Sequence, residues 1–378
     1  MTEMKDDLKK TPLFNEHLRL KAKMVDFSGW SMPLQYSSII EEVKAVRENI
    51  GMFDVSHMGE FLVKGPDTEK FIDKVITNSF STLKNGEICY SPICNENGGI
   101  IDDLLVYKFS NQKAMIVVNA SNISKDFNWF KKQAESFRVD LFNISEETAL
   151  IAVQGPKTEE VLQEISQIVL KDIEYYCFTE GRVNGIKVLI SRTGYTGEDG
   201  FELYVSPDAS IPLWRKILEV GQSVGIKPCG LGARDVLRLE AAYMLYGNDI
   251  DENTTPLEAS LTWTVKFEKE DFIGKNALLE QKEQGLEKVL KGFVISGKAI
   301  ARHGDKILKD EKEVGYITSG TKSPTLDKSI ALGYVKKDFA KINEEFIVKI
   351  RDKDFKATIV KLPFYRGTVK SKTKKKSS

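Results

Sequence analysis

Two adjacent carboxylates, Asp102 and Asp103, lie near the start of an apolar run, residues 100–107, that has the residue types of a β-strand. Burying a carboxylate among Ile, Leu and Val removes its hydration, so such an acid must be paired, kept neutral or used in chemistry. Successive side chains of a strand point to opposite faces, so the two acids cannot serve the same pocket. One acid is therefore predicted to be functional and the other structural, and alternation alone leaves open which is which.

Gly98 and Gly99 precede the two acids and predict a sharp turn into the strand. A pair of glycines also lets a ligand or another stretch of backbone approach closely. The simpler interpretation is a hairpin turn in which an Asp acts as a turn former, and turn chemistry alone favours it.

Glu202 lies on the second strand of a predicted hairpin, residues 183–205, and shares one face with Tyr204. That face must be solvated or must contact a ligand, because the alternate residues are apolar. Together with Tyr195 in the turn, it would form a partly dry wall. A carboxylate in such a wall can bind a flat heterocycle through two parallel hydrogen bonds from adjacent N–H donors. A solvated surface charge is the simpler interpretation.

Arg234 stands near the start of a predicted helix, residues 231–243. Its planar fork of donors suits a carboxylate, which can belong to Asp235, to Glu240 or to a ligand. The sequence leaves a structural ion pair and a ligand contact equally open. The glycines of residues 230–235 do not form a dinucleotide fingerprint, because the third glycine is absent.

The chain has 378 residues, enough for two or three domains with separate cores. Lys+Arg and Asp+Glu both count 55, so no overall field favours nucleic acid or an anionic membrane. Residues 1–10 lack the apolar segment of a secretory signal, and no apolar run reaches the length of a membrane span. We therefore expect a cytoplasmic protein with neither nucleic acid nor membrane as a partner.

The four cysteines are scattered, which is typical of reduced thiols. Cys89 and Cys94 have the spacing C-x4-C, but no second pair follows and the three histidines lie far away in the sequence. We therefore expect no metal site.

A Ser-x-x-Glu capping box at Ser38 and Glu41 predicts an amphipathic helix that ends at Gly51. Further on, residues 61–69 resemble residues 151–159, since each segment combines an apolar strand, a Gly-Pro turn and a helix start. This internal similarity predicts two related α+β units packed side by side.

Six collinear motifs resemble those of the T-protein of the glycine cleavage system, the tetrahydrofolate-dependent aminomethyltransferase. They are DVSHM (54–58), GGIIDDL (98–104), VQGP (153–156), TGYTGE (193–198), GLGARDVLRLE (230–240), and TSG (318–320) followed by SPTL (323–326). The resemblance runs in register from about Thr11 to Gly367. Because the motifs are many and collinear, the resemblance is highly specific.

The resemblance implies an α+β fold of three domains arranged like a clover leaf around a central folate channel. The expected limits are a discontinuous α+β domain, residues 1–54 with 146–285, and a second α+β domain, residues 55–145. A small all-β, barrel-like domain is expected over residues 286–367, and a disordered Lys-rich tail over residues 368–378.

The resemblance also implies the site. Asp102 matches the family's catalytic aspartate and is expected to face the folate amines, where it stabilises positive charge and assists proton transfer. Ligand-binding roles are implied for Glu202, which would hold the pterin edge, and for Arg234. Pocket positions are implied for Tyr90, Asn119 and Tyr195, and a ligand contact for Arg366. Gly98 and Gly99 would clear space for the folate.

The implied reaction transfers a one-carbon unit from the aminomethylated lipoyl arm of H-protein to tetrahydrofolate, with release of ammonia and without a metal. Two alternatives stay open. One is a folate-dependent demethylase of a small methylated amine or sulfonium compound. The other is a non-catalytic folate-binding accessory protein, whose relatives carry a Lys-Gly-Cys motif that this chain lacks.

Overall fold

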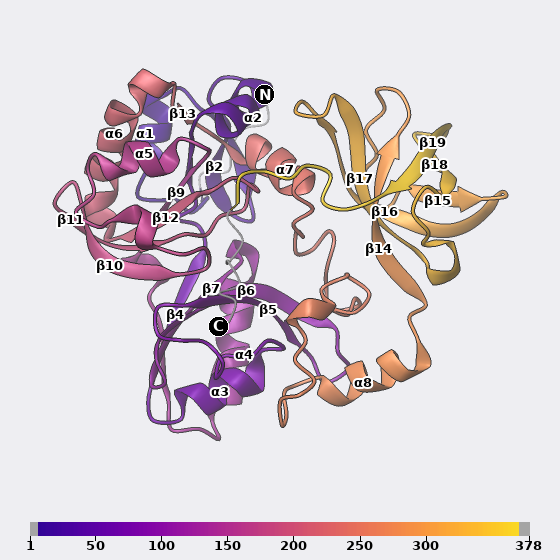
Figure 1. Cartoon of the computed structure of the whole chain (residues 1–378), viewed down its shortest axis with the longest axis horizontal. Helices are drawn as coiled ribbons and strands as arrows, with labels where there is room; N and C mark the ends of the chain where they lie inside the picture. The colour runs from indigo at the N-terminus through magenta and orange to yellow at the C-terminus, as the bar shows by residue number, and fades with distance from the viewer. Residues whose placement is uncertain (1–6, 370–378) are drawn as a thin grey trace, which may run out of the picture.

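The computed structural model of the chain describes residues 7–369 and arranges three units around a common centre (Figure 1). Each unit is built on its own sheet: one has six strands, one has five strands, and one is a closed barrel. The predicted α+β fold with three units and a barrel-like β domain is confirmed. No helix within residues 7–369 is long and apolar enough to cross a membrane.

The first unit contains the six-stranded sheet, in the order β10-β11-β12-β9-β3-β13. These strands are β3 (Gly51–Asp54), β9 (Ala149–Gln154), β10 (Phe178–Val183), β11 (Ile186–Ser191), β12 (Gly200–Val205) and β13 (Lys227–Pro228). The helices here are α1 (Phe14–Arg19), α2 (Ile39–Glu48), α5 (Thr158–Gln163), α6 (Pro207–Val220) and α7 (Leu231–Glu240), and a small hairpin is formed by β1 (Lys23–Phe27) and β2 (Trp30–Gln35). One face of the sheet packs on Trp214 and Ile217 of α6.

The predicted helix after Ser38 is α2, and the Ser38 hydroxyl accepts a hydrogen bond from the Glu41 amide at 3.2 Å. The helix ends earlier than predicted, at Glu48. Gly51 instead begins β3, where a side chain would lie 2.2 Å from Val46. The glycine is therefore required for close packing of the strand on α2.

The second unit contains the five-stranded sheet, in the order β5-β6-β7-β4-β8, with two helices on one face. Its elements are β4 (Gly59–Lys64), α3 (Thr68–Val75), β5 (Ile88–Cys94), β6 (Ile100–Ser110), β7 (Lys113–Val118), α4 (Ile123–Ala134) and β8 (Asp140–Asn143). Phe61 of β4, Phe71 of α3 and Phe130 of α4 meet in the core between the sheet and the helices.

The internal similarity corresponds to equivalent turns in these two units. Gly65 joins β4 to α3 at φ 144°, and Gly155 joins β9 to α5 at φ 137°. A Cβ at Gly65 would lie 2.3 Å from the Arg138 carbonyl oxygen, and one at Gly155 would lie 2.4 Å from the Asn49 carbonyl oxygen. Both turns thus need glycine, because each has a positive φ and leaves no room for a Cβ atom. The prediction of two related α+β units is confirmed.

The third unit is the closed barrel, in the order β14-β17-β16-β15-β18-β19. Its strands are β14 (Lys288–Ile295), β15 (Lys306–Lys309), β16 (Lys312–Ser323), β17 (Lys328–Lys336), β18 (Glu345–Ile350) and β19 (Lys353–Val360). Phe293, Ile317 and Val348 fill its interior and have no exposed surface.

The segment before the barrel contains α8 (Lys275–Gln284) and contacts the second unit. The Lys266 amide donates to the Thr77 carbonyl at 2.9 Å, and the Ile273 amide donates to the Lys74 carbonyl at 3.0 Å. The limits assigned to the three domains stay a prediction.

The prediction of a disordered tail from residue 368 onward is wrong for Thr368, whose amide donates to the Glu198 carboxylate at 3.0 Å. The Thr368 hydroxyl donates to the same carboxylate at 2.7 Å. Residues 370–378 lie outside the described residues.

The expectation that Gly98 and Gly99 clear space for a ligand is wrong. A Cβ at Gly99 would lie 1.9 Å from the Glu252 carbonyl oxygen, and one at Gly98 would lie 3.0 Å from Leu278. Gly98 also has φ 82°, in the left-handed region that favours glycine. The pair therefore lets the turn before β6 pack against the polypeptide that follows α7 and against α8.

Gly99→Ala is expected to lower the free energy of unfolding by about 1–3 kcal/mol, because the new methyl group would overlap a backbone carbonyl that cannot rotate away. Urea unfolding of the purified protein measures this loss. Gly285→Ala is the matched control: no atom lies within 4 Å of its Cβ position, so only the cost of its φ of 91° remains. An equal loss in both variants would contradict the packing role of Gly99.

Candidate functional site

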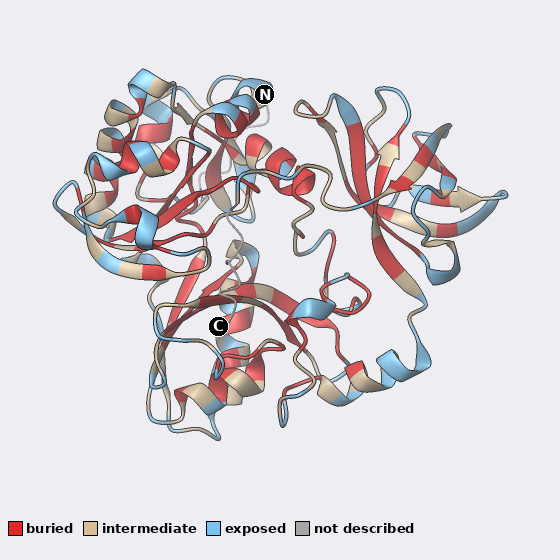
Figure 2. Cartoon of the chain, in the orientation of Figure 1, coloured by how far each residue is buried: buried red, intermediate tan, exposed pale blue. Residues whose placement is uncertain are grey.

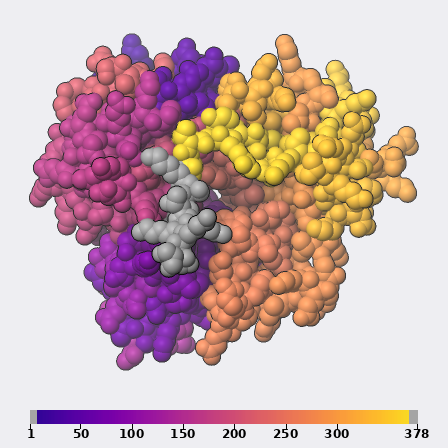
Figure 3. Space-filling model, in the orientation of Figure 1, coloured from indigo at the N-terminus to yellow at the C-terminus, as the bar shows by residue number. Residues whose placement is uncertain are grey.

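A cavity of about 550 Å³ lies at the centre of the molecule and is bounded by side chains from distant parts of the chain. Glu202 and Tyr204 of β12 form one wall, Asp103 and Leu105 of β6 form another, and Leu362 and Pro363 come from the segment after the barrel. Figure 3 shows this last, yellow segment crossing from the barrel towards the six-stranded unit. The volume and the mixture of aromatic and polar groups suit a small organic ligand.

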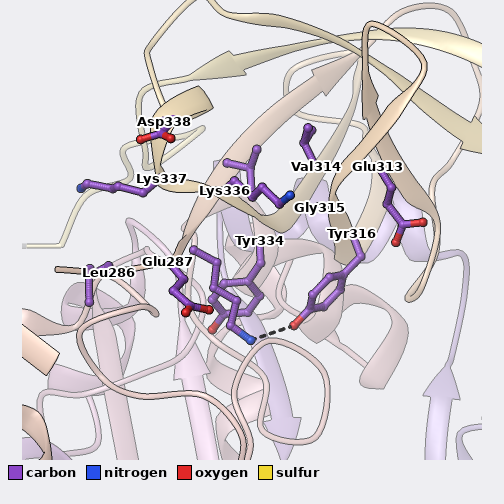
Figure 4. Close-up of a pocket in the computed structure, with 12 residues that line it drawn as sticks. Leu286, Glu287, Glu313, Val314, Gly315, Tyr316, Tyr334, Lys336, Lys337 and Asp338 are labelled. Atoms are coloured by element: carbon purple, nitrogen blue, oxygen red, sulfur yellow. Dashed lines mark hydrogen bonds between the residues drawn. The ribbon is translucent and has the colours of Figure 1, made fainter. Parts of the chain in front are cut away.

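A second hollow, of about 490 Å³, lies on the outside of the barrel (Figure 4). Tyr316 and Tyr334 line it together with charges of both signs, and Lys288 Nζ lies 3.5 Å from the Tyr316 hydroxyl. Among the residues that the structure describes, no buried polar atom in this wall lacks a partner. The central cavity is therefore the candidate site.

The two acids of β6 lie on opposite faces, as alternation predicts, but the acid that lines the cavity is Asp103 and not Asp102. Asp103 lines the central cavity, where its Oδ2 accepts a hydrogen bond from the Tyr90 hydroxyl at 3.0 Å. Asp102 is fully buried and does not line the cavity; its carboxylate accepts a hydrogen bond from Asn122, at the start of α4, at 2.7 Å. Asp102 therefore does not face the cavity, contrary to what the motif match implied, because its side chain points to the face of β6 that α4 covers.

Asn119 connects the two acids. Its Nδ2 lies 2.8 Å from Oδ1 of Asp102 and 2.9 Å from Oδ1 of Asp103, and its backbone amide donates to Asp102 at 3.2 Å. Burial, followed by the charge of Asp102, raises the pKa of Asp103 to about 7. Burial and the same Asp102 carboxylate raise the pKa of Asp126 to about 11, so Asp126 is neutral at physiological pH. Asp103 can thus gain or lose a proton near neutral pH, which suits acid–base chemistry.

Glu202 faces the cavity, and only 7% of its surface is exposed. The Thr193 hydroxyl donates to its Oε2 at 2.5 Å, whereas Oε1 accepts no hydrogen bond from residues 7–369. Burial raises the pKa of Glu202, and the Thr193 hydrogen bond and the Arg234 charge oppose that rise. One carboxylate oxygen is thus available to a ligand donor.

Arg234 forms neither of the structural ion pairs that the sequence left open. Asp235 pairs with Arg238 at 2.7 Å, and Glu240 pairs with Arg47 at 2.7 Å. The Arg234 guanidinium lines the cavity instead and lies 4.7 Å from the centre of the Tyr195 ring. No carboxylate of the described residues lies within ion-pair distance of it. Burial lowers its pKa, against the opposing influence of Tyr195 and Glu202. A half-buried cation without an anionic partner suits a ligand acceptor.

Five of the seven predicted site residues therefore line the cavity: Tyr90, Asn119, Tyr195, Glu202 and Arg234. Asp102 lies behind its wall. Arg366 is exposed and does not line the cavity, although Leu362 and Pro363 nearby do. Its predicted ligand contact was carried over from a short isolated motif, and the structure does not bring it into the cavity wall.

Several lining residues were not predicted from the sequence, among them His57, Trp263 and the segment 241–246. Burial and the Arg234 charge lower the pKa of His57 to about 4, so its imidazole is neutral at physiological pH. Trp263 is 60% exposed and stacks on Tyr90 with ring centres 5.8 Å apart. His57 lies inside the DVSHM motif, residues 54–58, so the motif could have predicted it as a site residue.

The first three residues of the segment 241–246, residues 241–243, were predicted to continue the helix, but α7 ends at Glu240. Ala242 has φ 58°, and Arg238 Nη1 donates to the Tyr243 carbonyl at 3.2 Å. These two features turn the chain out of the mostly buried helix and along the cavity (Figure 2). No glycine or proline signals this break.

Comparisons with known proteins agree with this architecture. The family model described as the GCVT N-terminal domain matches residues 13–269, and the model described as the glycine cleavage T-protein C-terminal barrel domain matches residues 288–366. The chain belongs to the glycine cleavage T-protein family. The predicted aminomethyltransferase of the glycine cleavage system is thereby confirmed.

Individual relatives support the same assignment. The chain is 58% identical to the aminomethyltransferase of Thermosipho melanesiensis over 97% of this chain and 100% of the relative. It is 55% identical to that of Thermotoga maritima, over 96% and 99% respectively. A crystal structure of glycine cleavage system aminomethyltransferase T from Bartonella henselae superposes with a TM-score of 0.91 at 33% identity, covering 96% of this chain and 100% of that one.

Proposed function

We propose that this T-protein binds tetrahydrofolate in the central cavity and transfers to it the one-carbon unit of an aminomethylated lipoyl arm carried by H-protein. The observation that carries the proposal is that two groups line the same cavity: a carboxylate oxygen of Glu202 that accepts no hydrogen bond, and the Arg234 guanidinium, which has no carboxylate within ion-pair distance among the described residues. A pterin ring presents two adjacent N–H donors on one edge and a carbonyl acceptor beside them. Glu202 takes the donors, Arg234 donates to the acceptor, and Tyr195 and Tyr90 supply aromatic wall surface.

Asp103 performs the proton chemistry in this proposal. Tetrahydrofolate supplies the amine nitrogen that accepts the one-carbon unit. The Asp103 carboxylate, held by Tyr90 and Asn119, stabilises positive charge on the nitrogen and carbon centres as they meet, and takes a proton that the nitrogen loses. As the carbon becomes bonded to two folate nitrogens, its bonds to the lipoyl sulfur and to the amino nitrogen break. The two protons from the folate nitrogens end on these leaving groups, which depart as the dihydrolipoyl thiol and ammonia. Its low exposure strengthens this electrostatic effect, because little water screens it.

The deciding experiment is the formation of 5,10-methylenetetrahydrofolate from tetrahydrofolate and H-protein loaded with the aminomethyl group. Turnover with loaded H-protein, together with no turnover of small methylated amines or sulfonium compounds, supports the proposal. The reverse preference favours the demethylase. Tight folate binding without turnover of any donor favours the accessory protein.

Arg234→Met is expected to weaken tetrahydrofolate binding by about 10–100-fold, because it removes a charge-assisted hydrogen bond from a wall with little water. Isothermal titration calorimetry measures the affinity. Arg182→Met is the matched control: Arg182 is exposed and donates only to the Gly185 carbonyl, at 2.6 Å. Unchanged affinity in the Arg234 variant would remove that residue from the ligand site.

A further inference from the structure

A chain of four buried hydroxyl groups ends on Glu202. The Tyr204 and Tyr107 hydroxyls are 2.7 Å apart, those of Tyr107 and Ser191 are 3.1 Å apart, and those of Ser191 and Thr193 are 2.7 Å apart. The last link is the 2.5 Å hydrogen bond from Thr193 to the carboxylate. The four side chains belong to residues that are at most 5% exposed, so water does not compete for these bonds.

The chain has one possible direction when Glu202 is ionised. A carboxylate only accepts hydrogen bonds, so Thr193 must donate its single hydroxyl proton to Glu202. Ser191 must then donate to Thr193, and Tyr107 must donate to Ser191. Tyr204 in turn donates to Tyr107. Each of the four hydroxyl groups therefore donates to the next group towards Glu202. Hydrogen bonds aligned in one direction strengthen one another.

The chain also joins two units of the fold. Tyr107 lies on β6 of the five-stranded sheet, whereas Ser191 ends β11 and Glu202 and Tyr204 lie on β12 of the six-stranded sheet. The orientation of the cavity carboxylate is therefore fixed from both sheets. Another buried carboxyl group, that of Glu60 on β4, has a pKa raised well above the ordinary value by burial and by Glu202. Burial and the neighbouring Glu202 thus both disfavour a charge on Glu60.

We propose that Thr193, Ser191 and Tyr107 are positioning residues that align the ionised Glu202 carboxylate for the 2-amino edge of the pterin ring. The inference rests on the proposed function. The chain occupies one lone pair of Oε2 from the buried side, and Oε1 accepts no hydrogen bond from residues 7–369. Oε1 and the second lone pair of Oε2 therefore present a fixed pair of acceptor sites to two adjacent N–H donors, and the site discriminates against a ring that lacks one of them.

The test compares binding of tetrahydrofolate and of its 2-desamino analogue by calorimetry, in the full chain and its variants. The wild-type protein is expected to prefer tetrahydrofolate by about 100-fold, because the analogue leaves a carboxylate acceptor unpaired. Thr193→Val is expected to reduce this preference at least about tenfold, and Ser191→Ala about three- to fivefold. Thr193→Ser keeps the hydroxyl and is expected to restore the wild-type ratio.

The ratio of the two affinities separates alignment from general damage, since a purely structural defect weakens both ligands equally. Tyr107→Phe is a third variant for the case in which Thr193→Val does not fold, and circular dichroism reports folding of each. Wild-type ratios in Thr193→Val, Ser191→Ala and Tyr107→Phe, together with a lost preference in Glu202→Gln, overturn the inference and leave the proposed function standing. A wild-type ratio in Glu202→Gln overturns both the inference and the proposed pterin contact.

Discussion

Replacing Asp103 by Asn is expected to lower the rate of one-carbon transfer by at least about 100-fold, while tetrahydrofolate affinity changes by less than about threefold. The amide keeps the size of the side chain and can still accept the Tyr90 hydrogen bond. It carries no negative charge and cannot take a proton from the reacting amine. The loss therefore falls on the chemical step, which single-turnover formation of methylenetetrahydrofolate measures directly.

The control for Asp103→Asn is Asp140→Asn, which changes an exposed acid at the start of β8, on the opposite edge of the five-stranded sheet from β5. That variant is expected to transfer at the wild-type rate. Near wild-type transfer by Asp103→Asn, together with loss of transfer in Asp102→Asn, would falsify the assignment of Asp103 to the reacting face and return it to Asp102.

The reversal of Asp102 and Asp103 marks the limit of sequence reasoning at this site. Alternation along β6 correctly predicts that the two acids point to opposite faces of the sheet. The choice between them depends on what covers each face. One face is covered by α3 and α4 of the same unit, whereas the other is covered by the six-stranded sheet and the ligand cavity, which assemble from residues far away in the sequence. Apolar residues pack on both faces of β6, so the local composition does not show which face borders the cavity.

Other features were predictable because their causes are local. The capping hydrogen bond at Ser38 and the two Gly-Pro turns depend on a few consecutive residues, so the start of α2 and the repeated strand-turn-helix could be predicted. The end of α7 has no such local cause. Ala242 adopts its left-handed conformation with support from Arg238, which is itself held by Asp249 at 2.6 Å and by Ser319 of the barrel at 2.9 Å. Tertiary contacts therefore decide where this helix ends.

Asp102→Asn is expected to move the pH dependence of transfer to lower pH without abolishing transfer. The pKa of Asp103 is about 7, raised first by burial and then by the charge of Asp102. Because the ionised form of Asp103 acts, the wild-type rate is expected to rise with pH and to reach half its maximum near pH 7. Removing the Asp102 charge lowers the pKa of Asp103, so the rise should move down by about one pH unit. An Asn oxygen in place of Oδ1 can still accept from the Asn119 and Asn122 side chains, whereas the Asn119 backbone amide loses its acceptor at Oδ2.

Single-turnover rates between about pH 5.5 and pH 8.5, with tetrahydrofolate and loaded H-protein both saturating, measure this shift. Single turnovers isolate proton transfer from product release. Asp140→Asn serves again as the control and is expected to keep the wild-type midpoint. Asp126 is neutral over this range, so it contributes no second titration to the profile. A midpoint that stays in place or moves upward in Asp102→Asn would show that Asp102 does not act on Asp103 through its charge.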